Sequence, residues 1–174
     1  MADLNNKIIA IIATNGFEDS ELTSPKEAVE AAGATARVIS TASGEIEGKK
    51  GTRVAVDLTT ADANAADFDA VILPGGTINA DTIRTDANAV KLVAELRGAD
   101  KPVGVICHGG WILTDADVIQ GVTLTSFPSL KTDLSNAGAT WVDEEVVVDG
   151  GFVSSRTPDD LPAFNKAIVE LFSH

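Results

Sequence analysis

Three short runs of apolar residues recur along the chain, at residues 7–13, 70–73 and 102–106. A run without polar alternation is expected of a central parallel strand, because helices cover such a strand on both faces. Amphipathic helical patterns separate the three runs along the chain. The alternation predicts a single α/β domain, doubly wound around a mostly parallel central sheet.

Besides a short helical stretch at about residues 109–113, four helices are expected between and after these runs. The first ends at Gly33 and has two possible starts: a capping box at residues 24–27 with proline at the first helical position, or a start near Ser20 with a kink at Pro25. Two more helices are expected at residues 86–97 and 129–137. The last is expected to be capped by Thr157, to start at Pro158, and to bury one apolar stripe. That stripe consists of Leu161, Phe164, Ile168, Leu171 and Phe172.

The remaining strands are shorter. Residues 35–41 alternate like a second strand, and a small hairpin is expected around the turn at residues 48–51. Further short strands are expected at residues 122–125, 140–142, 146–148 and 152–154. The chain has no internal repeat and no linker, so residues 1–174 are expected to form one domain.

Charge and cysteine content exclude several classes of function. The formal net charge of −13 disfavours nucleic acids and anionic membranes as partners, since both are bound through clustered cations. No apolar run approaches the roughly 20 residues that span a bilayer, and the first six residues are unlike a signal peptide, so we expect the cytoplasm. One cysteine and two histidines form no disulfide and no structural zinc site. No cofactor motif is present, and we expect neither a metal nor a cofactor.

The ends of the three apolar runs carry the candidate functional residues. The third run leads directly into Cys107-His108-Gly109-Gly110, a strand–cysteine–helix order that resembles a nucleophile elbow. A helix N-terminus favours a thiolate there, whereas the alternative is an inert buried cysteine. The second run ends at Gly75-Gly76, which predicts either an oxyanion hole or an ordinary turn. Glu18 follows the first run and either faces the same cleft or is a solvated loop carboxylate.

Residues 16–22, 73–76, 105–109 and 154–161, together with 126–150, resemble the PfpI family. This family belongs to the superfamily that also contains class I glutamine amidotransferase domains. The resemblance extends from about residue 7 to residue 172. It implies a flavodoxin-like sandwich and at least a homodimer.

The resemblance also implies roles for the candidate residues. Cys107 would be the nucleophile, Glu18 its carboxyl partner and His108 the adjacent catalytic histidine. Backbone N–H groups at Gly75, Gly76 and His108 would form the oxyanion hole. In peptidase members an acidic residue of the neighbouring subunit completes a triad, and Asp81 is the matching residue here.

Members of this family are peptidases, glyoxalases, protein deglycases, chaperones and oxidative-stress sensors. We expect a cytoplasmic stress-response enzyme whose cysteine attacks a small aldehyde or a glycated protein adduct. The alternatives are an intracellular cysteine peptidase and a non-enzymatic redox sensor or chaperone. No histidine lies between His108 and His174, so a catalytic histidine far downstream of the nucleophile is excluded, and His108 or Glu18 is expected to transfer protons.

Overall fold

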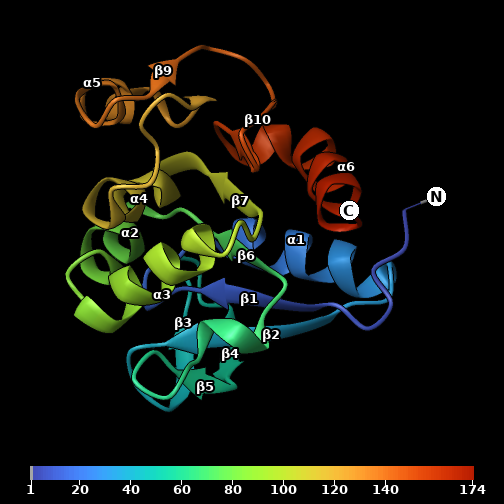
Figure 1. Cartoon of the computed structure of the whole chain (residues 1–174). Helices are drawn as coiled ribbons and strands as arrows, with labels where there is room; N and C mark the ends of the chain where they lie inside the picture. The colour runs from blue at the N-terminus through green and yellow to red at the C-terminus, as the bar shows by residue number, and fades with distance from the viewer. Residues whose placement is uncertain (1) are drawn as a thin grey trace.

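A computed structural model describes residues 2–174 and contains a seven-stranded central sheet (Figure 1). All neighbouring strands in it run parallel except the first pair, β10 and β11. In spatial order the strands are β10 (Val147–Asp149), β11 (Phe152–Ser155), β7 (Val103–Ile106), β6 (Ala70–Leu73), β1 (Ile8–Ile12), β2 (Thr35–Ser40) and β5 (Leu58–Thr59). The doubly wound α/β fold is therefore confirmed, and the three apolar runs form three adjacent central strands.

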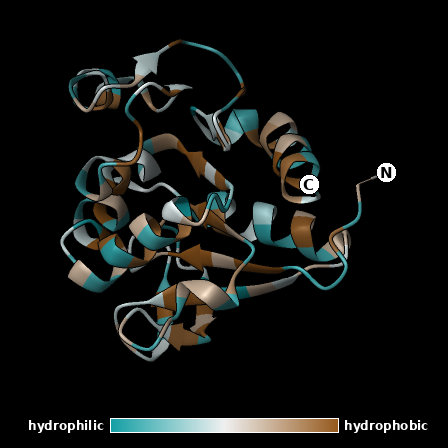
Figure 2. Cartoon of the chain, in the orientation of Figure 1, coloured by the Kyte–Doolittle hydropathy of each residue, from teal (hydrophilic) through white to brown (hydrophobic). Residues whose placement is uncertain are grey.

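Helices cover both faces of this sheet (Figure 1). They are α1 (Asp19–Ala31), α2 (Thr77–Ile83), α3 (Ala87–Gly98), α4 (Trp111–Ala116), α5 (Lys131–Asn136) and α6 (Leu161–Phe172). Ile9 and Ile11 point to the face packed by α1 and α6, whereas Ala10 and Ile12 point to the face packed by the other four helices. Figure 2 shows the central strands as mostly hydrophobic between more polar helix surfaces, as double coverage requires.

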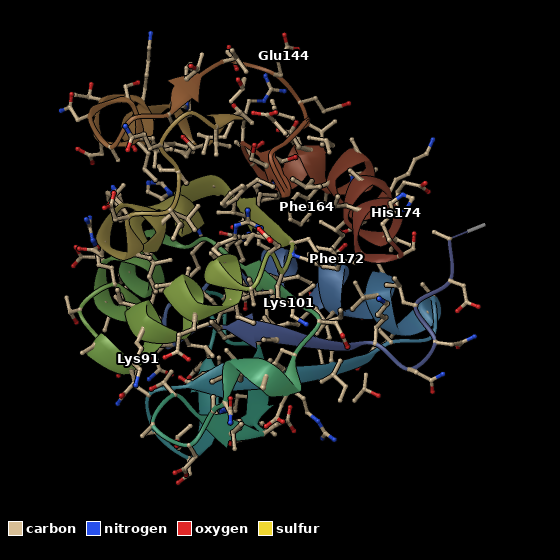
Figure 3. The ribbon with its side chains drawn as sticks, in the orientation of Figure 1. Lys91, Lys101, Glu144, Phe164, Phe172 and His174 are labelled. Atoms are coloured by element: carbon tan, nitrogen blue, oxygen red, sulfur yellow. The ribbon has the colours of Figure 1, made fainter. Side chains whose placement is uncertain are left out.

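The last helix is held by large side chains. Phe164 and Phe172 are buried against the sheet, and Figure 3 shows both on the inner side of α6. Gly104 in β7 makes this possible, because a Cβ atom there would lie 2.7 Å from a methyl group of Ile168. The stripe prediction is correct for four residues, but Leu171 is only half buried.

Two small sheets lie outside the central one. The predicted hairpin is confirmed as β3 (Gly44–Glu47) paired antiparallel with β4 (Arg53–Val56). The strands expected at residues 122–125 and 140–142 shorten to β8 (Thr123–Leu124) and β9 (Thr140–Trp141), which pair with each other. Short 3-10 turns complete the chain at Ala65–Asp67, Cys107–Gly110, Pro128–Leu130 and Pro158–Asp160.

Several predicted helix boundaries are wrong. Helix α1 begins at Asp19 and runs through Pro25, so of its two predicted starts the one near Ser20 is confirmed and the capping box at residues 24–27 is wrong. Helix α6 begins at Leu161, because residues 158–160 form a 3-10 turn and the Thr157 side chain caps nothing. Helix α2 follows Gly75-Gly76 and was not predicted.

None of the helices in residues 2–174 combines the length and the apolar character that crossing a membrane requires.

Candidate functional site

The carboxyl ends of β1, β6 and β7 bring three loops together at one edge of the sheet. These strands are parallel neighbours, so the segments that follow them meet there. Gly76 adopts φ 90°, and a Cβ atom on it would lie 2.5 Å from the backbone nitrogen of Glu18. Only glycine lets the loops after β1 and β6 approach this closely.

Cys107 begins the turn after β7 and has φ 60°, a left-handed conformation that is strained for any residue with a Cβ atom. Its side chain is 9% exposed. The backbone N–H groups of His108 and Gly76 face its sulfur and work to lower the pKa of the thiol. The nucleophile elbow predicted from the sequence is therefore present.

The carboxyl group beside the thiol belongs to Glu21, one turn into α1 from Glu18. Glu21 is fully buried, and its Oε1 accepts a hydrogen bond of 2.9 Å from the backbone nitrogen of Gly75. Its Oε2 has no hydrogen-bond partner among residues 2–174. Burial, helped by the nearby charge of Glu18, raises the pKa of Glu21 to about 8. Glu21 is therefore protonated at neutral pH.

The protonation of Glu21 decides the state of the sulfur. Burial first, and then the negative charge of Glu21, raise the pKa of the Cys107 thiol to about 12. The second cause disappears while Glu21 keeps its proton, and a neutral carboxyl can donate a hydrogen bond to sulfur. The pair therefore carries one negative charge at most near neutral pH, and the two groups titrate as a unit.

The prediction that Glu18 lies against the thiol is wrong. Glu18 is buried, and its two carboxylate oxygens accept from the Nζ atoms of Lys49 at 2.5 Å and Lys50 at 3.1 Å. Burial works to raise the pKa of Glu18, but hydrogen bonds and positive charge from the two lysines bring it below its ordinary value. Glu18 is therefore ionised at neutral pH and cannot donate a proton to the site.

His108 lies next to the sulfur, with Nδ1 3.2 Å from Sγ of Cys107. Its Nε2 lies 3.4 Å from the hydroxyl oxygen of Thr77 and 3.3 Å from that of Ser129. The ring stacks on Phe127, with centroids 4.5 Å apart. Burial, and then the positive charge of Lys49, lower the pKa of His108, so the imidazole is neutral and able to accept a proton.

Two further predictions concern the oxyanion hole and Asp81. Because the Gly75 N–H donates to Glu21, the N–H groups of Gly76 and His108 remain as the two donors at the sulfur. Asp81 is exposed on α2, one helical turn after Thr77. Within the chain the hydroxyls of Thr77 and Ser129, not Asp81, face Nε2 of His108. A role of Asp81 in a neighbouring subunit stays a prediction.

The turn of the β3–β4 hairpin is fixed onto the loop that follows β1. Asp19, which is buried, accepts hydrogen bonds from the backbone nitrogens of Lys50 at 3.0 Å and Thr52 at 2.9 Å. The backbone nitrogen of Lys49 donates to the Phe17 carbonyl at 3.0 Å. Neither Asp19 nor Lys49 was identified from the sequence. The site therefore includes the predicted hairpin, whose contact with the loop after β1 was not predicted.

Metal-ligating side chains form no candidate site in the described part of the chain. Residues 2–174 contain no group of three or more histidine, cysteine, aspartate or glutamate side chains placed to hold a metal ion. His174 lies at the end of α6, where it faces Glu170 at 3.7 Å (Figure 3).

Comparison with known proteins identifies relatives that share this fold. Residues 6–171 match the profile of the DJ-1/PfpI family. An uncharacterized protein of Staphylococcus saprophyticus is 51% identical, with 94% of this chain and 96% of the relative covered. A Bacillus subtilis protein named "Putative cysteine protease YraA" is 42% identical, with 95% and 98% covered.

Two solved structures are also similar. Drosophila melanogaster DJ-1beta superposes with a TM-score of 0.88 at 26% identity, over 96% of this chain and 90% of that one. A two-domain protein of Anabaena variabilis, with DJ-1/ThiJ/PfpI-like and ferritin-like domains, gives a TM-score of 0.92 at 36% identity. This match covers 95% of the present chain and 48% of the Anabaena chain.

Proposed function

Because the chain belongs to the DJ-1/PfpI family, we propose that it is a cytoplasmic stress-response enzyme in which Cys107 attacks the carbonyl carbon of a small aldehyde or of a glycated protein adduct. One observation carries the proposal. The sulfur of Cys107 has a protonated carboxyl at Glu21, a neutral imidazole 3.2 Å away at His108 and two backbone N–H donors around it. A nucleophile, an acid, a base and an oxyanion hole are the groups that carbonyl addition requires.

The first step forms a carbon–sulfur bond. Sγ of Cys107 attacks the aldehyde carbon while the thiol proton passes to Nδ1 of His108. The carbonyl oxygen gains negative charge, which the N–H groups of Gly76 and His108 stabilise, and it is then protonated by Glu21. The product is a hemithioacetal.

A 2-oxoaldehyde then isomerises without any external oxidant. A base of the site removes the proton from the former aldehyde carbon, and a proton returns to the neighbouring carbon. This converts the hemithioacetal into a thioester of a 2-hydroxy acid. Water hydrolyses the thioester, releasing the acid and the free thiol. Methylglyoxal and one water thus give lactate. In a glycated amine, the thiol attacks the hemiaminal carbon, the carbon–nitrogen bond breaks, and the amine leaves with the thiol proton; the resulting hemithioacetal then follows the same route.

Incubation with methylglyoxal tests this proposal. We expect lactate to accumulate with the wild-type protein, and Cys107→Ala to give only the uncatalysed background. Glu21→Gln keeps the size of the side chain and loses the exchangeable carboxyl proton, so we expect a slower rate with an intact fold. Absence of lactate from an alkylatable wild-type protein would contradict the glyoxalase reaction.

The second candidate is an intracellular cysteine peptidase, which the name of the Bacillus subtilis relative favours. Turnover of casein or fluorogenic peptides by the wild type, and its loss in Cys107→Ala, would support it. In that case Asp81→Asn should abolish peptide turnover through the neighbouring subunit.

A third candidate is a redox sensor or chaperone. Cys107 would then be oxidised without turnover of methylglyoxal or of peptides.

A further inference from the structure

Two adjacent lysines lie over the buried carboxylate of Glu18. They belong to the turn between β3 and β4, which is bound to the loop after β1 through Asp19 and the Phe17 carbonyl. These contacts involve the lysine backbones, so the turn is held without the lysine side chains. The two ammonium groups both contact Glu18 and contribute their charge to this edge of the sheet.

Glu18 connects this turn to the nucleophile through Gly75. The backbone nitrogen of Glu18 donates to the Gly75 carbonyl at 3.2 Å. A Cβ atom on Gly75 would lie 2.7 Å from Cβ of Cys107 and would also meet Oε1 of Glu21. A path of direct contacts therefore leads from Lys49 through Glu18 and Gly75 to Cys107.

Lys49 and Lys50 differ in how they act on the site. Lys49 is half exposed, and its charge acts on Cys107, Glu21 and His108. The hydrogen bond to Glu18 is the main cause that raises the pKa of Lys49, and charge at Cys107 and Glu21 adds to it. Lys50 contacts the other oxygen of Glu18, and its side chain is 70% exposed. Lys50 is thus a matched control for Lys49.

The two ammonium groups share one carboxylate. Both contact Glu18, whereas Asp19, the other ionised carboxylate at this turn, accepts hydrogen bonds from backbone nitrogens, including that of Lys50. Glu21 and His108 are neutral at neutral pH. An ammonium group beside a nucleophile favours an anion at that place.

We propose that Lys49 is a positioning residue whose ammonium holds one negative charge beside Cys107, so that the site favours the thiolate and prefers ligands with a carboxylate next to the reacting carbon. The preference for such ligands rests on the proposed function, since it names a substrate class for the same site.

A pair of alkylating reagents tests the proposal without requiring turnover. Iodoacetate and iodoacetamide both transfer a two-carbon group to a thiolate with loss of iodide, but only iodoacetate has a carboxylate next to the reacting carbon. Cys107 is the single cysteine, so intact mass reports its modification alone. The measured quantity is the ratio of the two second-order rate constants, which does not depend on the thiolate fraction. The pH profile of iodoacetamide alkylation gives the apparent pKa of the thiol separately.

We expect Lys49→Met to lower the iodoacetate to iodoacetamide ratio by about threefold to fivefold, the effect of one unit charge a few ångströms away in a watery environment. The apparent pKa of the thiol should rise in the same variant. Lys49→Arg should restore both values, and Lys50→Met should leave both near those of the wild type. Added salt should reduce the difference between wild type and Lys49→Met.

Three results would overturn the proposal. One is an unchanged ratio in Lys49→Met, and another is an equal loss in Lys50→Met, since both would deny Lys49 a specific role. The third is a wild-type Cys107 that neither reagent modifies, which would also overturn the proposed function. If both reagents modify Cys107 and the iodoacetate to iodoacetamide ratio is the same in the wild type and in Lys49→Met, the Lys49 proposal fails while the proposed function stands.

Discussion

Burial of Glu21 has a stability cost that depends on pH. Burial raises the pKa of Glu21 to about 8 from an ordinary value of 4.5. Between these values the unfolded chain releases a proton that the folded chain keeps. The free energy of unfolding therefore falls as pH rises through this window, by up to about 1.4 kcal/mol per pH unit from this group.

Glu21→Gln should remove this dependence, because glutamine is neutral and can still accept from the Gly75 nitrogen. Urea unfolding of both proteins at pH 5, 6, 7 and 8 measures the difference. We expect the variant to gain stability relative to the wild type as pH rises. Parallel stability curves would mean that Glu21 is ionised in the folded protein at neutral pH.

Oxidation of Cys107 is the second prediction at this scale. A thiolate oxidises more readily than a thiol, so if Glu21 and the two backbone N–H groups stabilise a thiolate at the buried Cys107, mild peroxide should add about 32 Da as a sulfinic acid. The Cys107→Ala protein should keep its mass under the same treatment. If the wild-type mass also stays unchanged while a model thiol oxidises, Cys107 is not reactive.

Sequence reasoning identified Cys107 and His108 but selected the wrong acidic residue. Glu18, Asp19 and Glu21 lie within four positions, and only the register of α1 separates them. Carboxylates are rarely buried, so burial of Glu21 was not expected. One signal was available: in a helix that starts near Ser20, Glu21 shares a face with Pro25 and Val29, and all three are buried.

At the scale of elements, α6 offers a test of packing. Phe164 is fully buried between this helix and the sheet, so Phe164→Ala should cost about 3–5 kcal/mol in the free energy of unfolding. Leu171→Ala on the same helix is the control and should cost much less, since Leu171 is half buried. Chemical denaturation measures both, and equal losses would contradict the orientation of α6.

Elements with a continuous apolar run or a repeated apolar stripe were predicted well, and short elements were not. The runs that became β1, β6 and β7 are uniformly apolar, and α6 repeats its apolar stripe over three turns. Helix α2 has seven residues, too few for a period to be recognised. Whether β8 and β9 join the central sheet or pair separately depends on tertiary contacts, which the sequence of each strand does not contain.

At the scale of the whole molecule, the assembly state is the main expectation from the family resemblance. We expect a homodimer or a higher homo-oligomer, with a mass at least twice 18.0 kDa in sedimentation equilibrium. Asp81→Asn tests a role in the neighbouring site, because this exposed residue should leave the mass unchanged if it does not hold the subunits together. A monomer at all concentrations would exclude any role of Asp81 between subunits.

The left-handed backbone of Cys107 has a final consequence. Any residue with a Cβ atom is strained at φ 60°, whereas glycine is not. We therefore expect Cys107→Gly to be more stable than Cys107→Ala by about 1 kcal/mol, although glycine usually weakens a folded chain. Urea unfolding of the two variants measures this difference, and a more stable alanine variant would contradict the strain.

Directed evolution of this protein would then depend on what is selected. A library screened for heat resistance alone should accumulate glycine at position 107, since glycine relieves the backbone strain there. A library screened for activity should retain the cysteine and acquire its compensating mutations elsewhere. The residue found at position 107 would thus show whether selection had acted on stability or on activity.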